Sequence, residues 1–243
     1  MLYERTFPVN NYFSINIPLV GEVLKDQEAY YGLLSACVAT PFDLAVQLDD
    51  IGIDYDSISR YQLFTMLFSN VINECEHQDI PAFNLIFQGL DPRKLMFAQD
   101  LTTNSFVFVD KETKNVVIDE RTYLQLSAIL RKVNHIEKRD VKPGNKEAKE
   151  YRLARNRKKQ ARAMRNKGRD TELEDNIVAL VNNKEFKYDF ESVRGLTIYQ
   201  FYRSLEQVVT ITNYHQVMSG YYAGTLDIQK VDQKLLNWLS NNK

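Results

Sequence analysis

Positively charged side chains are concentrated in one segment in the middle of the chain. Between residues 131 and 169 the sequence holds 16 Lys or Arg and 4 Asp or Glu, a formal charge of +12. The remainder of the chain carries −13, although the whole is nearly neutral at −1. Clustered Lys and Arg side chains bind phosphates or carboxylates. This segment is therefore the strongest candidate for a binding function.

Six of these side chains are predicted to bind a partner. They lie in residues 146–167, which are rich in helix-forming residues and contain neither Gly nor Pro. The candidates are Arg152, Arg155, Lys158, Lys159, Arg162 and Arg165. Three interpretations stay open: a solvated linker helix, a surface for an acidic protein, and a surface for nucleic acid. Tyr151 alone offers a ring for base stacking, and the acidic remainder of the chain is itself one candidate partner.

Four aspartates close together in sequence raise the question of a metal site. They are Asp49, Asp50, Asp54 and Asp56. Hard cations need several converging carboxylate oxygens. The spacing does not match the helix–loop–helix calcium motif, because Gly52 is misplaced and no Glu stands at the twelfth position. We therefore expect a solvated turn and no metal site.

No other pattern in the sequence predicts catalysis. His77, His135 and His215 match no metal-binding or nucleophile pattern, and the glycines form no phosphate-binding loop. Paired carboxylates for glycoside hydrolysis stay open, but nothing in the sequence selects a pair. We expect a non-enzymatic protein with no catalytic residue and no cofactor.

The N-terminal part reads as a mixture of strands and helices. Alternating apolar residues at 13–19 predict a strand, which Pro18 should confine to a sheet edge, and residues 105–118 predict a hairpin in the same small sheet. Residues 79–104 have no clear propensity. Ser59 and Asp119 are predicted to cap helices whose apolar residues recur every three or four positions. The fold class expected is α+β and predominantly helical, with a small antiparallel sheet.

The chain is expected to divide into three parts. Residues 1–140 form the α+β domain, 141–169 a basic helical linker, and 170–243 an all-helical domain. Capping-box spacings begin the C-terminal helices at Thr171 and Thr197. The aromatic residues of this last part are either core or an exposed interface, and burial distinguishes the two.

Composition and hydropathy favour a globular protein away from membranes. The chain is 44% hydrophobic and 26% charged. It has no run of eighteen apolar residues and no secretory signal, so a cytoplasmic location is expected. Cys37 and Cys75 lie in apolar helical runs and are expected to be buried and reduced.

Several segments together resemble a family of proteins from tailed bacteriophages that infect Gram-positive bacteria, encoded among the tail and baseplate morphogenesis genes. The segments are ATPFD at 39–43, LDDIGIDY at 48–55, KPGN at 142–145 with its basic helix, FKYDFE at 186–191, GYYAGT at 220–225 and LNWL at 236–239. They span nearly the whole chain in order, and none is a catalytic motif. The resemblance implies an assembly chaperone or minor structural component, with no active-site residue to carry over.

The leading hypothesis is a non-enzymatic phage tail or baseplate assembly protein that acts through protein–protein contacts. Its partners would be tail or baseplate proteins, with no membrane contact, in the host cytoplasm or in the virion. The alternative is a nucleic-acid-binding regulatory protein that uses the basic helix 146–167. The sequence defines neither the identity of the partner nor the oligomeric state.

Overall fold

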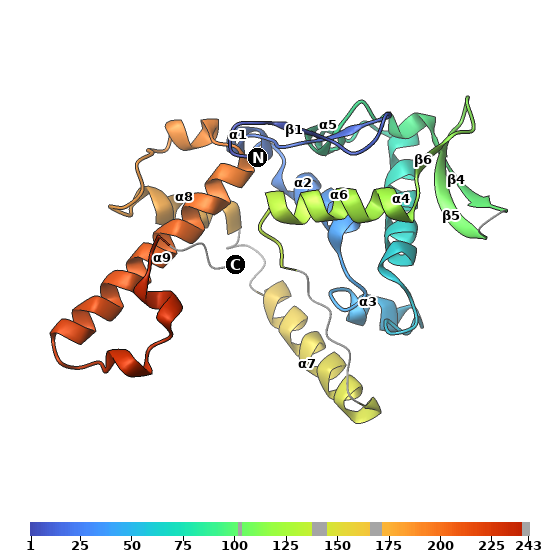
Figure 1. Ribbon diagram of the computed structural model, residues 1–243. Helices are drawn as coiled ribbons and strands as arrows, with labels where there is room; N and C mark the ends of the chain where they lie inside the picture. The colour runs from blue at the N-terminus through green and yellow to red at the C-terminus, as the bar shows by residue number, and fades with distance from the viewer. Residues whose placement is uncertain (102–103, 138–144, 166–171, 240–243) are drawn as a thin grey trace.

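The computed structural model describes residues 1–101, 104–137, 145–165 and 172–239, and for 163–165 and 172 the backbone alone (Figure 1). The described residues form an α+β fold that is mostly helical, as expected. The strands belong to two separate antiparallel sheets of three strands each, so the prediction of one sheet was wrong.

The first sheet has the order β1-β2-β3, with β1 at Thr6–Pro8, β2 at Ser14–Asn16 and β3 at Phe87–Gln88. Ile15 of β2 pairs with Phe7 on one side and with Phe87 on the other. The predicted strand is therefore central and not an edge. Pro18 is tolerated because it lies beyond the end of β2, where its carbonyl oxygen accepts a hydrogen bond from the Ile198 amide at 2.9 Å.

The second sheet has the order β4-β5-β6, with β4 at Leu95–Asp100, β5 at Ser105–Asp110 and β6 at Val116–Ile118. The β5–β6 hairpin was predicted. Its turn is held by Asp110, whose Oδ1 accepts a hydrogen bond from the Thr113 amide at 2.7 Å. The prediction for 79–104 was wrong, because this stretch contains β3, β4 and a short helix.

The helices of the N-terminal half surround an aromatic core. They are α1 Val20–Val23, α2 Gln27–Val38, α3 Ala45–Asp50, α4 Arg60–His77, α5 Pro81–Ile86 and α6 Glu120–Val133. Ser59 and Asp119 cap α4 and α6 as predicted. Phe64 of α4 stacks on Tyr123 of α6 at 4.6 Å between ring centroids, which fixes the two helices against each other. Cys37 and Cys75 are buried free thiols.

Three helices follow in the C-terminal part, and the second and third of them pack on the same core. They are α7 Lys146–Arg165, α8 Glu172–Val181 and α9 Ile198–Tyr222, with 3₁₀ turns at Ser192–Gly195, Ile228–Lys230 and Gln233–Leu236. Thr197 caps α9 through the predicted capping box, whereas Thr171 lies outside the described residues. Leu173, Ile177 and Phe201 are buried in one apolar cluster with residues of β2, α2 and α4. The start of α9 is thereby anchored to the N-terminal half.

Candidate interaction surface

The basic segment forms the helix α7, and one side of it is docked on the rest of the chain. Asn145 begins the helix by accepting a hydrogen bond from the Ala148 amide at 2.8 Å. Leu153 is buried in a small apolar cluster with residues of α3 and α4, including Leu48 and Leu63. This side chain provides the apolar anchor of the docked side.

Ion pairs flank Leu153 one helical turn before it and one turn after it. Lys149 pairs with Asp54 and, at 3.0 Å, with Asp56, and its ammonium lies 4.7 Å from the centre of the Tyr55 ring. Arg157 bonds Asp49 at 2.7 Å and Asp50 at 2.6 Å. The four aspartates that the sequence analysis assigned to a solvated turn are therefore partners of α7. We call this arrangement of Lys149, Leu153, Arg157 and the segment 49–56 the clip.

The electrostatics of the clip keep both sides ionised. Desolvation lowers the pKa of Lys149, but its hydrogen bonds to Asp54 and Asp56 outweigh that effect, and the pKa is raised. Hydrogen bonds to Asp50 and then Asp49 raise the pKa of Arg157, and the bond from Lys149 lowers the pKa of Asp54. The contact is thus a pairing of full charges at neutral pH.

The opposite side of α7 faces solvent. Arg155, Lys158, Lys159 and Arg162 are all exposed. At 100° per residue, Arg155, Lys158 and Arg162 point away from the docked side of the helix, and Lys159 lies at the edge of this solvent-facing side. Tyr151 lies on the same side, with 71% of its surface exposed. We call Arg155, Lys158, Lys159 and Arg162 the outward face.

The six predicted binding residues divide between these environments. Four form the outward face. Arg152 instead is half-buried, and its Nη1 atom has no hydrogen-bond partner among the described residues. The side chain of Arg165 lies outside the described residues. Lys149 and Arg157 were not among the predicted binding residues. The signal for both was the acidic segment 49–56, whose charge complements theirs.

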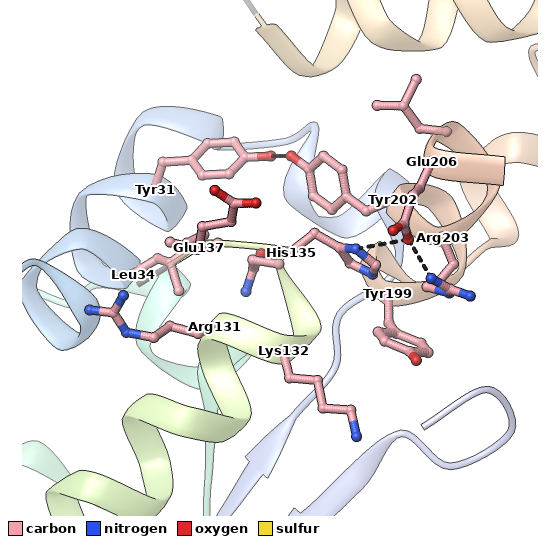
Figure 2. Close-up of a pocket in the computed structure, with 13 residues that line it drawn as sticks. Tyr31, Leu34, Arg131, Lys132, His135, Glu137, Tyr199, Tyr202, Arg203 and Glu206 are labelled. Atoms are coloured by element: carbon pink, nitrogen blue, oxygen red, sulfur yellow. Dashed lines mark hydrogen bonds and ion pairs between the residues drawn. The ribbon is translucent and has the colours of Figure 1, made fainter. Parts of the chain in front are cut away.

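A cavity of about 860 Å³ lies on another part of the surface, where α2, the end of α6 and α9 meet (Figure 2). Across it the hydroxyl groups of Tyr31 and Tyr202 are 2.8 Å apart, and His135 Nδ1 lies 3.6 Å from Glu206. These contacts join the N-terminal helices to α9.

His135 is the least ordinary residue of this cavity. It ends α6 with a φ of 52°, a left-handed conformation that favours glycine, and its Nε2 atom is buried without a hydrogen-bond partner among the described residues. Burial lowers the pKa of His135, while Glu206 opposes and Arg203 reinforces that effect. The imidazole is therefore neutral at neutral pH and can donate or accept one hydrogen bond.

The described residues were also compared with the requirements for metal binding and for spanning a membrane. No group of three or more His, Cys, Asp or Glu side chains among them is arranged to bind a metal ion. No helix within the described part of the chain combines the length and apolar character needed to span a bilayer.

Comparison with known protein families places the end of the chain beside a phage-associated domain. Residues 159–243 match the family model described as the YomV second domain, which is associated with Bacillus phages and prophages. The match begins within α7 and includes α8 and α9. No curated protein and no solved structure matches the chain. The expected link to phages is thus confirmed for a phage-associated domain, whereas the tail or baseplate role stays a prediction. Over its last 85 residues, the chain is similar to a phage-associated family.

Proposed function

We propose that this chain is a non-enzymatic assembly protein of a phage tail or baseplate, which holds an acidic structural subunit through the outward face of α7. The observation that carries the proposal is the two-sided charge of this helix. One side is docked by the clip, and the other presents Arg155, Lys158, Lys159 and Arg162 to solvent. The match of residues 159–243 to a phage-associated domain supports the phage setting.

The clip makes the outward face a better binding surface than a free basic helix would be. A helix without a docked side is marginal in water, and a partner would have to order it on binding. Leu153 and the two ion-paired cations hold α7 in place beforehand. The outward charges then steer an acidic partner during encounter and fix its orientation.

The contacts of the clip support a proposal for the chemistry of the partner. Arg157 bridges the carboxylates of two consecutive aspartates, and Lys149 lies between two more with Tyr55 beneath its ammonium. The outward face repeats this chemistry with two arginines and two lysines. We expect its partner to present closely spaced Asp or Glu side chains, and the complex to form in the host cytoplasm or in the assembling virion.

The test is capture of tail or baseplate subunits from infected cells by the tagged full-length chain, with and without nuclease. The variant Arg155→Glu, Lys158→Glu, Lys159→Glu and Arg162→Glu should lose these subunits with its melting temperature nearly unchanged. A matched control reverses four exposed cations elsewhere: Lys25, Lys114, Arg121 and Lys187. It should retain the subunits. Equal capture by both variants would contradict the proposal.

Nucleic acid is the second candidate partner, and one observation favours it. Tyr151 is 71% exposed and lies one turn from Arg155 on the same side of α7, where a base could stack on its ring. In that case every partner is lost after nuclease treatment. Affinity for RNA or DNA should then fall steeply with salt, and the slope should decrease by roughly 0.7 to 0.9 for each phosphate-contacting cation removed.

A further inference from the structure

The strand β4 has an open edge. It is an outer strand of the second sheet, which lies at one end of the molecule (Figure 1), and β5 is its only partner strand among the described residues. Natural edge strands usually contain Lys, Pro or a bulge, which prevents pairing with another chain. Leu95–Asp100 has the sequence LMFAQD and pairs with β5 in continuous register, so it has none of these features. Its edge is therefore open to a further strand.

The register of β4 shows which backbone groups lie on this edge. The Lys94 carbonyl accepts a hydrogen bond from the Lys111 amide at 2.7 Å, on the side of β5. Backbone groups alternate between the two sides of an antiparallel strand, so the open edge carries those of Leu95, Phe97 and Gln99. The Leu95 amide is bonded to the turn before the strand. The Phe97 and Gln99 amides have no backbone acceptor on this side among the described residues, and they are the two donors of the edge.

Apolar side chains lie beside the same edge. Phe97 is 43% exposed, and its ring centroid is 5.1 Å from that of Phe106, which is 42% exposed. On the other face of the sheet, Met96 is 37% exposed. The ring of Phe97 is also 5.5 Å from that of Phe108, which is fully buried. The apolar surface thus continues from the core to the open edge, as it does in interaction sites.

We propose that β4 pairs with β4 of a second copy of this chain, antiparallel about a two-fold axis at Phe97, so that the two sheets join into one. In this register the two Phe97 residues exchange a pair of hydrogen bonds. Each Gln99 amide donates to the Leu95 carbonyl of the second copy, so both donors of each edge are satisfied. Lys94 comes opposite Asp100 at both ends, and opposite charges are favourable across a strand pair.

The order of charges along β4 selects a second copy as the partner. Backbone pairing accepts almost any extended chain, so side chains must supply the selectivity. A cation, Lys94, precedes the strand, an anion, Asp100, ends it, and no charged residue lies between them. Within its own chain Lys94 reaches Glu112 only at 3.8 Å, and both side chains are mostly exposed. Self-pairing places each charge opposite its counterion, and a shift by two residues in either direction loses both pairs. The inference concerns β4 and does not depend on the role proposed for α7.

Sedimentation equilibrium of the full-length chain tests this pairing. We expect a monomer–dimer equilibrium at concentrations up to about 100 μM, the range of weak interfaces. Lys94→Glu places two carboxylates opposite each other at both ends and should weaken dimerisation several-fold. The charge swap, Lys94→Glu with Asp100→Lys, should restore it. Lys114→Glu is the matched control, because it makes the same charge change at an exposed position in the β5–β6 turn and should leave dimerisation unchanged.

Amide hydrogen exchange measured by NMR gives a second readout. The Phe97 and Gln99 amides should become protected as the concentration rises, whereas the Met96 and Ala98 amides, which bond β5, should be protected throughout. Gln99→Pro removes one open-edge donor without breaking a bond to β5. It should weaken dimerisation by at least about tenfold, because the pairing loses two of its four hydrogen bonds. If this variant fails to fold, Lys94→Glu and its charge swap decide.

Three results would each overturn the inference. The first is a wild-type chain that stays monomeric over the whole concentration range. The second is a charge swap that fails to restore the pairing weakened by Lys94→Glu. The third is exchange of the Phe97 and Gln99 amides that does not slow as the concentration rises.

Discussion

The helix α7 and the distal half of α9 are both exposed helices, but they are opposite in composition. Eleven of the twenty residues of α7 are charged, whereas none of the fourteen from Val209 to Tyr222 is Asp, Glu, Lys or Arg. α7 meets its own chain through ion pairs around one buried leucine. The stretch from Val209 to Tyr222 meets the rest of the chain with none of its residues buried. Ion pairs therefore help to hold α7 in place, whereas this stretch of α9 has neither ion pairs nor buried apolar side chains of its own.

The largest expected effect is on the apolar anchor of the clip. Leu153→Ala removes a side chain that is 8% exposed and should lower the free energy of unfolding by about 2 to 3 kcal/mol. The comparable truncation in the distal half of α9, Ile211→Ala, removes a half-buried side chain and should cost less than about 1 kcal/mol. Urea unfolding measures both. Equal losses would mean that the distal half of α9 is as well packed as the clip.

Next in size is the effect of reversing one charge on either side of α7. Arg157→Glu brings a third carboxylate to Asp49 and Asp50 and should undock the helix, so its amides exchange hydrogen several-fold faster. Arg155→Glu lies two residues away on the outward face and should leave exchange unchanged. Exchange measured by mass spectrometry over residues 145–162 distinguishes them. A similar increase for both variants would show that the two sides of α7 are not different.

The smallest effect expected is that of pH on the clip, because Asp54 is half-exposed. The pKa of Asp54 is lowered in the folded chain, chiefly by the hydrogen bond from Lys149. The folded state therefore binds the proton less readily than the unfolded state, and the contribution to stability is present above the unfolded pKa and lost as pH falls through the folded value. Hydrogen exchange of α7 should stay constant from neutral pH to about 5, after correction for intrinsic rates, and rise below about 4. Asp54→Asn should remove part of this dependence; an unchanged profile would place the dependence on other carboxylates.

Local signals in the sequence predicted helix boundaries well. Ser59, Asp119 and Thr197 each cap the helix expected of them, and the β5–β6 hairpin lies where its turn residues indicated. These features depend on residues a few positions apart. The sheets were predicted less well, since the pairing of Ile15 with Phe87 depends on how distant segments pack.

The candidate site shows the same limit. The sequence revealed both the basic helix and the acidic segment, and the acidic remainder of the chain was one predicted partner of the helix. It could not show that Arg157 pairs with Asp49 and Asp50, because more than one hundred residues separate them. Nor could it show that Arg152 turns inward while Arg155 points outward, since this depends on which side of α7 meets Leu48. No sequence signal marks the left-handed backbone conformation of His135 either, because that conformation is usually adopted by glycine.

The match to the phage-associated domain begins at Lys159, in the middle of α7. Lys149, Leu153 and Arg157, which dock the helix, all precede that position, and Arg162 follows it. The start of the matched region therefore falls inside a continuous helix. The docking of α7 depends on residues that lie before this point, so the part of the chain that is similar to the phage-associated family begins on a helix held in place by side chains outside it.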